Sequence, residues 1–188
     1  MERRRRSAEP LTLERIVEAA LVELDASGAD GVSLRGVARR LGVHVTSLYN
    51  HVPSKPALLD AMVDRALSGI TPPDPHAPWQ ERVRTLAVDF YQALAAHPAL
   101  IPVLASERGR PTSPGLFAVM EAALTCLSDA GLSPSHQVSA FRGFLAMVMG
   151  LVITHTRGAE STLEAAELAW REAGMAGLST ERQALMAL

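Results

Sequence analysis

Apolar residues recur every three or four positions along almost the whole chain, and no run of β-branched residues alternates with polar ones. This spacing gathers apolar side chains on one face of a helix. The first predicted helix begins after Thr12, whose hydroxyl suits an N-cap, and ends near Gly28. Its apolar face comprises Leu13, Ile16, Val17, Ala20, Leu21 and Leu24. The sequence therefore predicts an all-α protein.

Three short helices are predicted to follow, and each is bounded by residues that begin or end helices. Their ranges are 34–41, about 45–51, and from 54–56 to about 67. Ser33 can cap the first of them, and Gly42 ends it because glycine adopts a left-handed backbone without strain. Pro53 stops the second, which is expected to bury Leu48 and Tyr49.

A proline-rich segment then interrupts the helical pattern. Residues 68–78 contain four prolines, which a regular helix does not tolerate, so this segment is predicted to link two domains. The predicted organisation is a basic arm over 1–11, a first domain over 12–67, the linker over 68–78, and a second domain over 79–188. Helices are expected at 79–96, near Pro98 and Pro102, at 116–130, at 135–157, and twice in the tail, with a mobile loop over 106–115.

The helix predicted over 135–157 is apolar on all sides, which indicates that protein covers both of its faces. Its nearly uncharged run lies between Arg142 and Arg157 and falls short of the roughly 20 residues that a membrane span needs. No transmembrane segment is therefore predicted. The basic N-terminus has no apolar stretch behind it and does not have the pattern of a secretory signal.

Composition agrees with a globular protein of the cytoplasm. The chain has 188 residues, 48% of them hydrophobic, which is enough for a buried core. Cys126 is the only cysteine, so no internal disulfide can form, and its apolar surroundings predict a packing role. A net charge of −2 argues against nucleic-acid binding by the whole surface.

A local positive face changes that picture. Between Gly31 and Lys55, the only lysine, there is no acidic residue, while Arg35, Arg39 and Arg40 are basic. Two short helices joined by a glycine, with a small residue four positions before it, have the spacing of a helix-turn-helix. A purely structural hairpin is the alternative, and Arg39 and Arg40 taken singly fit a solvated helix equally well.

The segment RRLGVHVTSLYNHVPSKPALLDAM, within residues 12–67, resembles the DNA-binding domain of TetR-type transcriptional repressors, and looks closer to the tetracycline-repressor branch than to most of the family. Segments beyond residue 79 resemble the helical ligand-binding and dimerisation domain of that branch. The resemblance implies a repressor that binds double-stranded operator DNA, releases it when a small molecule binds, and works as a homodimer. No counterpart of the magnesium–tetracycline site is found, which makes tetracycline an unexpected effector.

The resemblance also assigns roles to residues. The helix that begins near Val45 is the expected recognition helix. The expected DNA-binding residues are Arg35, His44, Val45, Thr46, Ser47, Tyr49, Asn50, His51 and Lys55. Among these, Tyr49, His51 and Lys55 match positions that contact phosphates in the family. Arg35 matches one that can contact a base or a phosphate. The run Arg3 to Arg6 is either an arm that enters a minor groove or a solvated tail.

The second domain is expected to enclose an apolar effector pocket. Its candidate lining residues are Phe90, Tyr91, His97, Leu104, Phe117, Met120, Leu124, Phe144, Met147, Leu151 and His155. Each of them could equally be core, and the two histidines could equally be structural. Gly143, Ala146 and Gly150 leave a strip of small residues where a partner helix can come close.

No motif in the chain indicates catalysis, a cofactor or a metal site. His44 and His51 share a face but lie two helical turns apart, too far along the axis to hold one ion. There is no nucleophile elbow, phosphate loop or paired carboxylate in a recognisable motif. Two alternatives stay open: a helical carrier or enzyme that only retains the hairpin, and a DNA-bending architectural protein.

Overall fold

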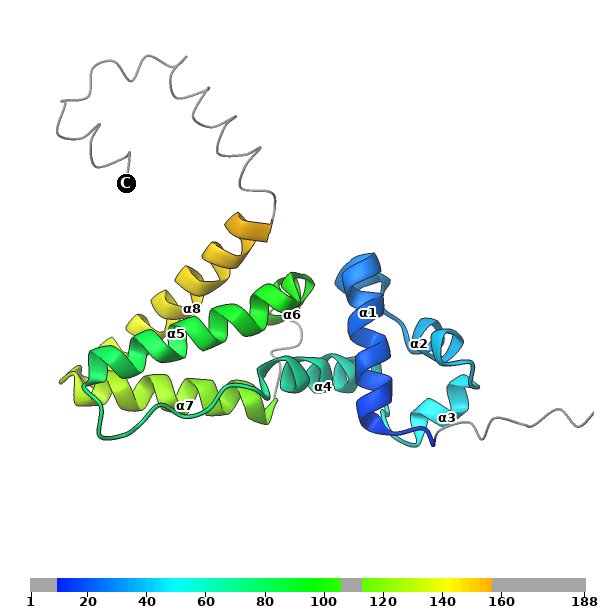
Figure 1. The fold of residues 1–188 in the computed structure, drawn as a ribbon, viewed down its shortest axis with the longest axis horizontal. Helices are drawn as coiled ribbons and strands as arrows, with labels where there is room; N and C mark the ends of the chain where they lie inside the picture. Colours follow the sequence, from blue (N-terminus) through cyan, green and yellow to red (C-terminus); the bar gives the residue numbers. More distant parts are fainter. Residues whose placement is uncertain (1–9, 106–112, 157–188) are drawn as a thin grey trace, which may run out of the picture. The chain divides into compact units, whose positions relative to one another are not determined.

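The computed structural model describes residues 10–105 and 113–156, and within these residues the chain is helical and has no strand. The predicted arm, most of the predicted loop and the two tail helices lie outside the described residues. By its contacts the chain divides into two compact units, residues 1–152 and 153–188. The helices are α1 (Leu13–Gly31), α2 (Leu34–Leu41), α3 (Val45–Tyr49), α4 (Lys55–Leu67), α5 (Trp79–Ala96), the 3-10 helix η1 (Pro98–Leu100), α6 (Ile101–Ala105), α7 (Pro114–Asp129) and α8 (Pro134–Thr156) (Figure 1).

Helix α1 begins where the sequence predicts it. The Thr12 side chain accepts a hydrogen bond from the backbone N–H of Arg15, with 3.3 Å between Oγ1 and N. The predicted end at Gly28 coincides with a break, because Gly28 has φ 71° and ψ 175°. A further helical turn continues to Gly31 beyond this break.

Helices α2 and α3 form the tight corner that the glycine spacing indicated. The Ser33 hydroxyl oxygen accepts from Gly36 N–H at 3.0 Å and caps α2. Gly42 ends that helix with φ 68°, a left-handed conformation that costs glycine little. Val43 N–H then donates to Ala38 C=O at 3.0 Å, which closes the turn before α3 begins.

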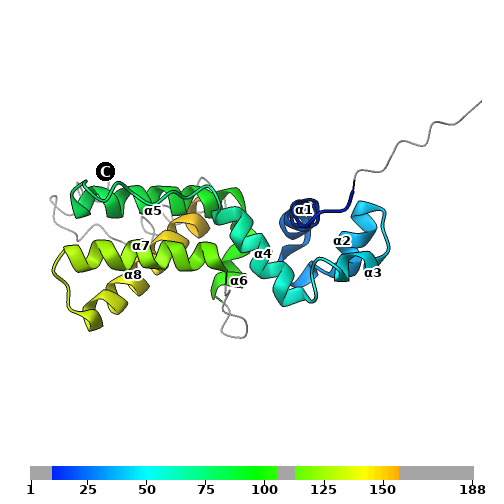
Figure 2. The same cartoon turned by 90° about the horizontal axis from the view of Figure 1, so that it is seen from below.

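Helices α1, α2, α3 and α4 lie together (Figure 2). Their buried apolar residues belong to a core that continues into the later helices. In this part of the chain the core includes Ile16 and Leu24 of α1, Val37 of α2, Leu48 of α3, Val52 just after α3, and Leu58 and Met62 of α4. Leu48 is buried as predicted, but the expectation that Tyr49 is buried is wrong, because 51% of this residue is exposed. Helix α3 has only five residues, so it can turn one narrow face inward, and Leu48 occupies that face.

Helices α5 and α7 pack against α4. Helix α7 contacts both α4 and α5, while η1 contacts α1 and α5. Phe90 is fully buried and stacks on Phe144 of α8, with 6.1 Å between ring centroids. Helix α7 begins at Pro114, two residues before the predicted start, because Ser113 caps it through the N–H of Leu116.

Helix α8 is covered on one side only in this single chain. Val148 and Val152 are buried, whereas Val138, Met147 and Leu151 are 47%, 54% and 44% exposed. The expectation that protein covers both sides is therefore not met by one chain alone. Among the described residues, α8 is also the one helix long and apolar enough to cross a membrane by length and composition; this is weak evidence, since helices that pack against protein pass the same test.

Candidate nucleic-acid interface and effector cavity

Helix α3 is anchored by one side and displays polar groups on the other. Leu48 and Val52 are buried, and the N–H of Val52 donates to the carbonyl of Leu48 at 2.8 Å, which holds the end of the helix in place. Seven of the nine predicted DNA-binding residues lie on α3 or within two residues of it. The exposed ones among these are His44, Thr46, Tyr49, Asn50 and His51, and the half-buried ones are Val45 and Ser47. These seven residues therefore lie together on or beside α3.

Arg35 and Arg39 extend this polar surface onto α2. Both residues are exposed, and neither has an acidic side chain within salt-bridge distance among the described residues. Together with the absence of acidic residues over 31–55, these cations give a positive face next to α3. Such a face suits the phosphate backbone of DNA.

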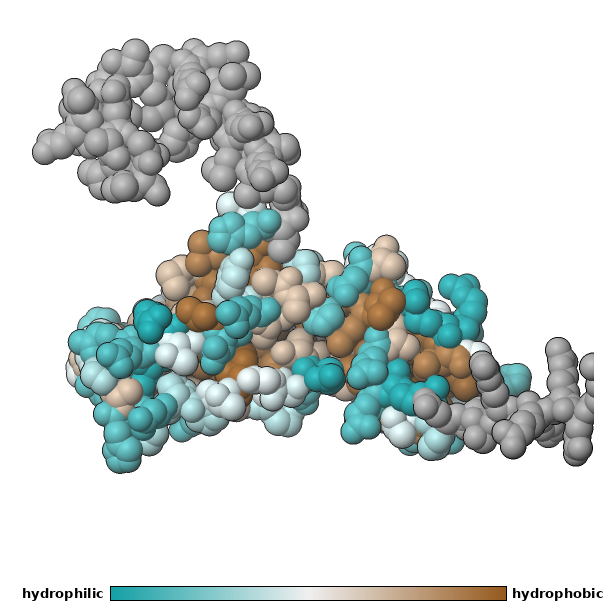
Figure 3. Space-filling view, viewed as in Figure 1, coloured by the Kyte–Doolittle hydropathy of each residue, from teal (hydrophilic) through white to brown (hydrophobic). Residues whose placement is uncertain are grey.

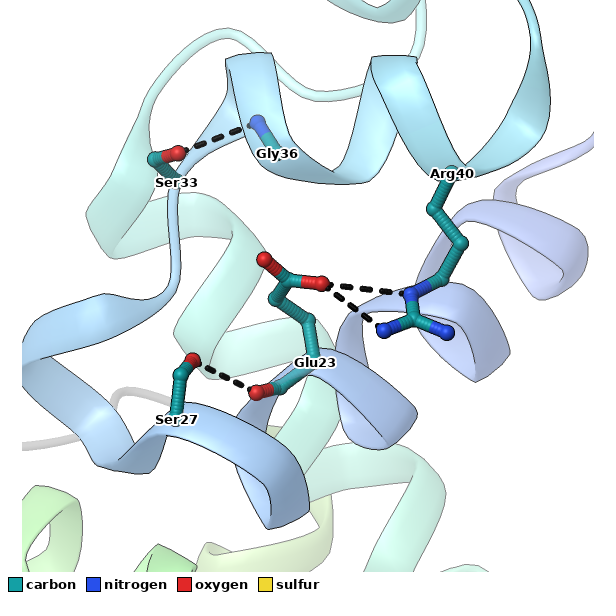
Figure 4. A network of polar contacts seen from close by, with 5 residues as sticks. All are labelled: Glu23, Ser27, Ser33, Gly36 and Arg40. Carbon is teal, nitrogen blue, oxygen red and sulfur yellow. Dashed lines mark hydrogen bonds and ion pairs between the residues drawn. The ribbon is translucent and has the colours of Figure 1, made fainter.

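Arg40, in contrast to Arg35 and Arg39, is paired with an acidic side chain. Its Nε and Nη2 atoms donate to Oε2 of Glu23 at 3.2 and 3.0 Å, so this arginine joins α2 to α1 (Figure 4). The other carboxylate oxygen of Glu23 lies over the first turn of α2, where a Cβ at Gly36 would be only 2.8 Å from it. Of the two arginines considered as solvated residues, Arg40 is therefore a structural contact.

Lys55 is also engaged within the fold. Its Nζ atom donates to the carbonyl oxygens of Ala29 and Asp30 at 3.0 and 3.3 Å, at the end of α1. These carbonyls lie in a terminal turn, where no further helical N–H can satisfy them. The ammonium group therefore fastens the start of α4 to the end of α1, in addition to any contact with phosphate.

A cavity of about 150 Å³ lies where α4, the linker, α5 and α7 meet. Its lining is mostly apolar and consists of Leu67, Ser68, Ile70, Thr71, Pro72, Leu86, Gly115, Ala118, Val119 and Ala122. None of the predicted pocket residues is among them. Sequence reasoning selected large side chains, namely phenylalanines, a tyrosine, leucines, methionines and histidines, whereas this space lies beside small residues at positions 115, 118 and 122 of α7.

The predicted pocket residues are dispersed over the helical bundle. Phe90 is buried in the core; the half-buried residues are Tyr91, His97, Leu104, Met120, Leu124 and Phe144; the exposed ones are Phe117, Met147, Leu151 and His155. His97 lines a second, more open hollow of about 450 Å³ between α1, α4 and α5. Its Nδ1 atom lies 3.1 Å from Oδ2 of Asp25, so this histidine connects η1 and α5 to α1.

One ion pair fastens α5 to α7. The side chain of Arg82 is almost fully buried and pairs with the half-exposed side chain of Asp129, and this hydrogen bond raises the pKa of the arginine. Cys126 lies nearby, and burial raises the pKa of its thiol, an effect that the positive charge of Arg82 partly opposes. The packing role predicted for this cysteine agrees with its burial.

Helices α2 and α3, joined by a tight turn at Gly42, have the geometry of a helix-turn-helix. Helix α4 connects them to the later helices. The fold is therefore that of a helix-turn-helix protein with a further all-helical part. Residues 16–62 match the family described as bacterial regulatory proteins, tetR family, and residues 71–182 match the tetracyclin repressor-like C-terminal domain. The chain belongs to the TetR family of transcriptional regulators.

Individual relatives agree with this assignment. The HTH-type transcriptional repressor DrrR1 of Streptomyces coeruleorubidus is 35% identical over 150 residues, which are 78% of this chain and 53% of the relative, so the chain spans about half of that protein. The tetracycline repressor protein class E of Escherichia coli is 28% identical over 76% of this chain and 68% of its own length. The crystal structure of the Streptomyces coelicolor TetR family protein ActR in complex with actinorhodin matches with a TM-score of 0.72 at 28% identity, covering 85% of this chain and 76% of that one.

Proposed function

We propose that this protein is a ligand-responsive transcriptional repressor, which binds a palindromic operator as a homodimer and releases it when a small hydrophobic molecule binds the second domain. The observation that carries the proposal is the exposed polar side of α3 beside Arg35 and Arg39 of α2, which have no acidic partner among the described residues. Two such helices in a dimer reach successive major grooves when their centres are about 34 to 36 Å apart. Membership of a family of transcriptional regulators supports a role through binding rather than catalysis, at the DNA in the cytoplasm.

Residues divide by the contact that each can make. Thr46, Ser47 and Asn50 offer hydrogen bonds to base edges, and Val45 offers apolar contact, for instance to a thymine methyl group. The phosphate contacts come from Tyr49, His51 and Lys55, while Arg35 reaches either a base or a phosphate, and His44 faces DNA at the start of the helix. Contacts to phosphates set the register of the protein, and contacts to bases select the sequence.

The effector site is the cavity between α4, the linker, α5 and α7. Apolar cavities of roughly 150 Å³ accept benzene-sized molecules, and a larger effector needs helices that move apart as it enters. ActR, a structural relative, forms a complex with actinorhodin, which supports a small-molecule effector for this chain as well. Ser68 and Thr71 supply the polar groups that would orient it. An effector changes operator affinity only if it binds the two states of the protein unequally.

The test is selection of duplexes from a random library, followed by footprinting on the DNA that flanks the gene. We expect enrichment of a palindrome whose half-sites are one helical turn apart, and loss of binding in the Asn50→Ala and Tyr49→Ala variants. Glu121→Ala, an exposed position on α7, serves as the matched control and should bind as the wild type does. Enrichment of no sequence, together with tight binding of a small molecule, would instead favour a helical carrier protein.

A further inference from the structure

The first turn of α7 is held against α4 by one carboxylate. The backbone N–H of Gly115 donates to Oδ1 of Asp64 at 2.7 Å, across 51 positions of sequence. A carboxylate at the amino end of a helix satisfies a free backbone donor and faces the positive end of the helix dipole. The contact therefore combines a short hydrogen bond with favourable electrostatics.

A larger residue would crowd this contact. A Cβ atom at Gly115 would stand 3.1 Å from Oδ1 of Asp64 and 3.3 Å from Cβ of Leu67. Both distances are shorter than ordinary van der Waals contact, so Asp64 and Leu67 would have to shift by a few tenths of an ångström to make room. Glycine at position 115 thus favours both the close approach of α7 to α4 and the hydrogen bond.

This contact borders the effector cavity. Gly115 and Leu67 line the cavity and also meet at the contact with Asp64. A molecule that enlarges the cavity has to press these two residues apart, which lengthens the hydrogen bond to Asp64. The other end of α4 carries Lys55, which is bonded to the last turn of α1. Helix α4 is therefore fastened at one end to the cavity wall and at the other to the DNA-binding domain.

We propose that Asp64 is a positioning residue that couples occupancy of the cavity to the placement of α4, and through α4 to operator affinity. The contact between Asp64 and Gly115 is intact in the operator-binding state and is broken when the cavity is filled. This inference rests on the proposed function, since it names the residue through which the same cavity acts on the same operator.

A cavity-filling substitution replaces the unidentified effector in the test. Ala122 lines the cavity, and Ala122→Leu places an aliphatic side chain in it; Ala118→Leu is a second filler. Dissociation constants for the selected palindrome are measured for each filler in the wild-type, Asp64→Ala and Asp64→Asn backgrounds. Thermal unfolding of every variant checks that it folds. Glu121→Ala, on the exposed side of α7, is the control background.

In the wild-type and Glu121→Ala backgrounds we expect filling to weaken operator binding by about tenfold, which is within the usual range of allosteric coupling. In the Asp64→Ala background the same filling should weaken binding by less than about twofold, because the link is already absent. Asp64→Asn keeps an oxygen acceptor for Gly115 N–H and should retain most of the effect. A purely structural role for Asp64 would lower thermal stability and leave the filling effect unchanged.

Hydrogen exchange gives a readout that needs no filler. Because coupling is reciprocal, operator binding should slow exchange of the Gly115 amide in the wild type and leave it unaffected in Asp64→Ala. Equal weakening by the fillers in all backgrounds, or no weakening in any folded variant, overturns the role of Asp64 while operator binding stands. A wild-type protein that selects no duplex overturns the proposed function, and the coupling with it.

Discussion

At the scale of single residues, the structure divides the cations of the DNA-binding domain into free and engaged groups. Arg35 and Arg39 have no acidic partner among the described residues, whereas Arg40 is held by Glu23 and Lys55 by two carbonyls. Sequence alone could not separate Arg39 from Arg40, because they are neighbours of the same type. The separation depends on Gly36, which allows Glu23 of α1 to approach α2 and reach one of them.

Replacing Arg35 and Arg40 in turn should therefore give different results. Each phosphate neutralised contributes about 0.9 to the slope of log affinity against log salt concentration, so Arg35→Ala should lower that slope by roughly one if it binds a phosphate. If Arg35 reads a base instead, we expect a loss of about 1 to 3 kcal/mol and relaxed selection at one position. Salt titrations of operator binding measure the slope, and selection with the variant reports specificity.

Arg40→Ala should act mainly on stability. Glu23 is 15% and Arg40 39% exposed in their side chains, so the loss should be near the upper end of the range of about 0.2 to 1 kcal/mol seen for solvent-accessible pairs. Chemical unfolding measures this loss. A salt slope that falls by one unit in Arg40→Ala, with unchanged stability, would show that this arginine contacts DNA and not Glu23 in the working protein.

The buried thiol of Cys126 predicts a dependence of stability on pH. Burial raises its pKa in the folded state, so the folded protein keeps a proton that the unfolded chain releases at lower pH. The associated stability is complete below the unfolded pKa and is lost as pH rises through the folded pKa. We expect Cys126→Ala to lack this alkaline loss, and unfolding curves at several pH values measure it. An equally steep alkaline decline in the variant would exclude the thiol as its source.

At the scale of elements, sequence predicted helix boundaries well wherever a local signal sets them. Thr12, Ser33 and Ser54 cap α1, α2 and α4 through their own side chains, and Gly42 ends α2, because these are interactions between near neighbours. The effector cavity was missed for the opposite reason. It is a space between four segments, defined by small residues that carry no periodic signal, so only the packing of α4 and α5 against α7 reveals it.

The corner between α2 and α3 gives a prediction of its own. Gly42 has φ 68°, so an alanine at this position would have to adopt a left-handed backbone, which costs about 1 to 2 kcal/mol of stability. No steric clash adds to this loss, since a Cβ at position 42 would meet nothing within 4 Å. Gly42→Ala should therefore lower the free energy of unfolding and weaken operator binding together, whereas Gly42→Asn, which tolerates this conformation better, should recover part of both. Chemical unfolding and operator titration measure the two losses, and undiminished stability in Gly42→Ala would refute the strain.

At the scale of the whole molecule, the apolar face of α8 requires a partner. Figure 3 shows hydrophobic residues gathered at the surface of the helical domain. On the exposed side of α8 lie Met147 and Leu151, which are one helical turn apart. Beside them a Cβ atom at Gly143 or Gly150 would meet nothing within 4 Å, so another helix could approach closely there. The pattern that would suit a membrane by length and composition also suits a second copy of this chain. We expect the proposed homodimer to use this face, which would bring two α3 helices to one palindrome.

Met147→Glu should therefore dissociate the dimer. A carboxylate at this exposed position costs the single chain little, but in an interface it is desolvated without a partner. Sedimentation equilibrium measures the loss of dimer, and affinity for the full palindrome should fall by about a hundredfold or more, towards that of a half-site, as bivalent binding is lost. Val88→Glu is the matched control, because Val88 is an exposed apolar residue on α5 and not on α8, and is 42% accessible.

Gly143→Ala is a second variant of the same face. In a free helix this change should raise the free energy of unfolding by about 0.5 to 1 kcal/mol, and in a close helix pair it should weaken association. A Met147→Glu protein that remains dimeric and binds the palindrome normally would place the dimer interface elsewhere in the chain.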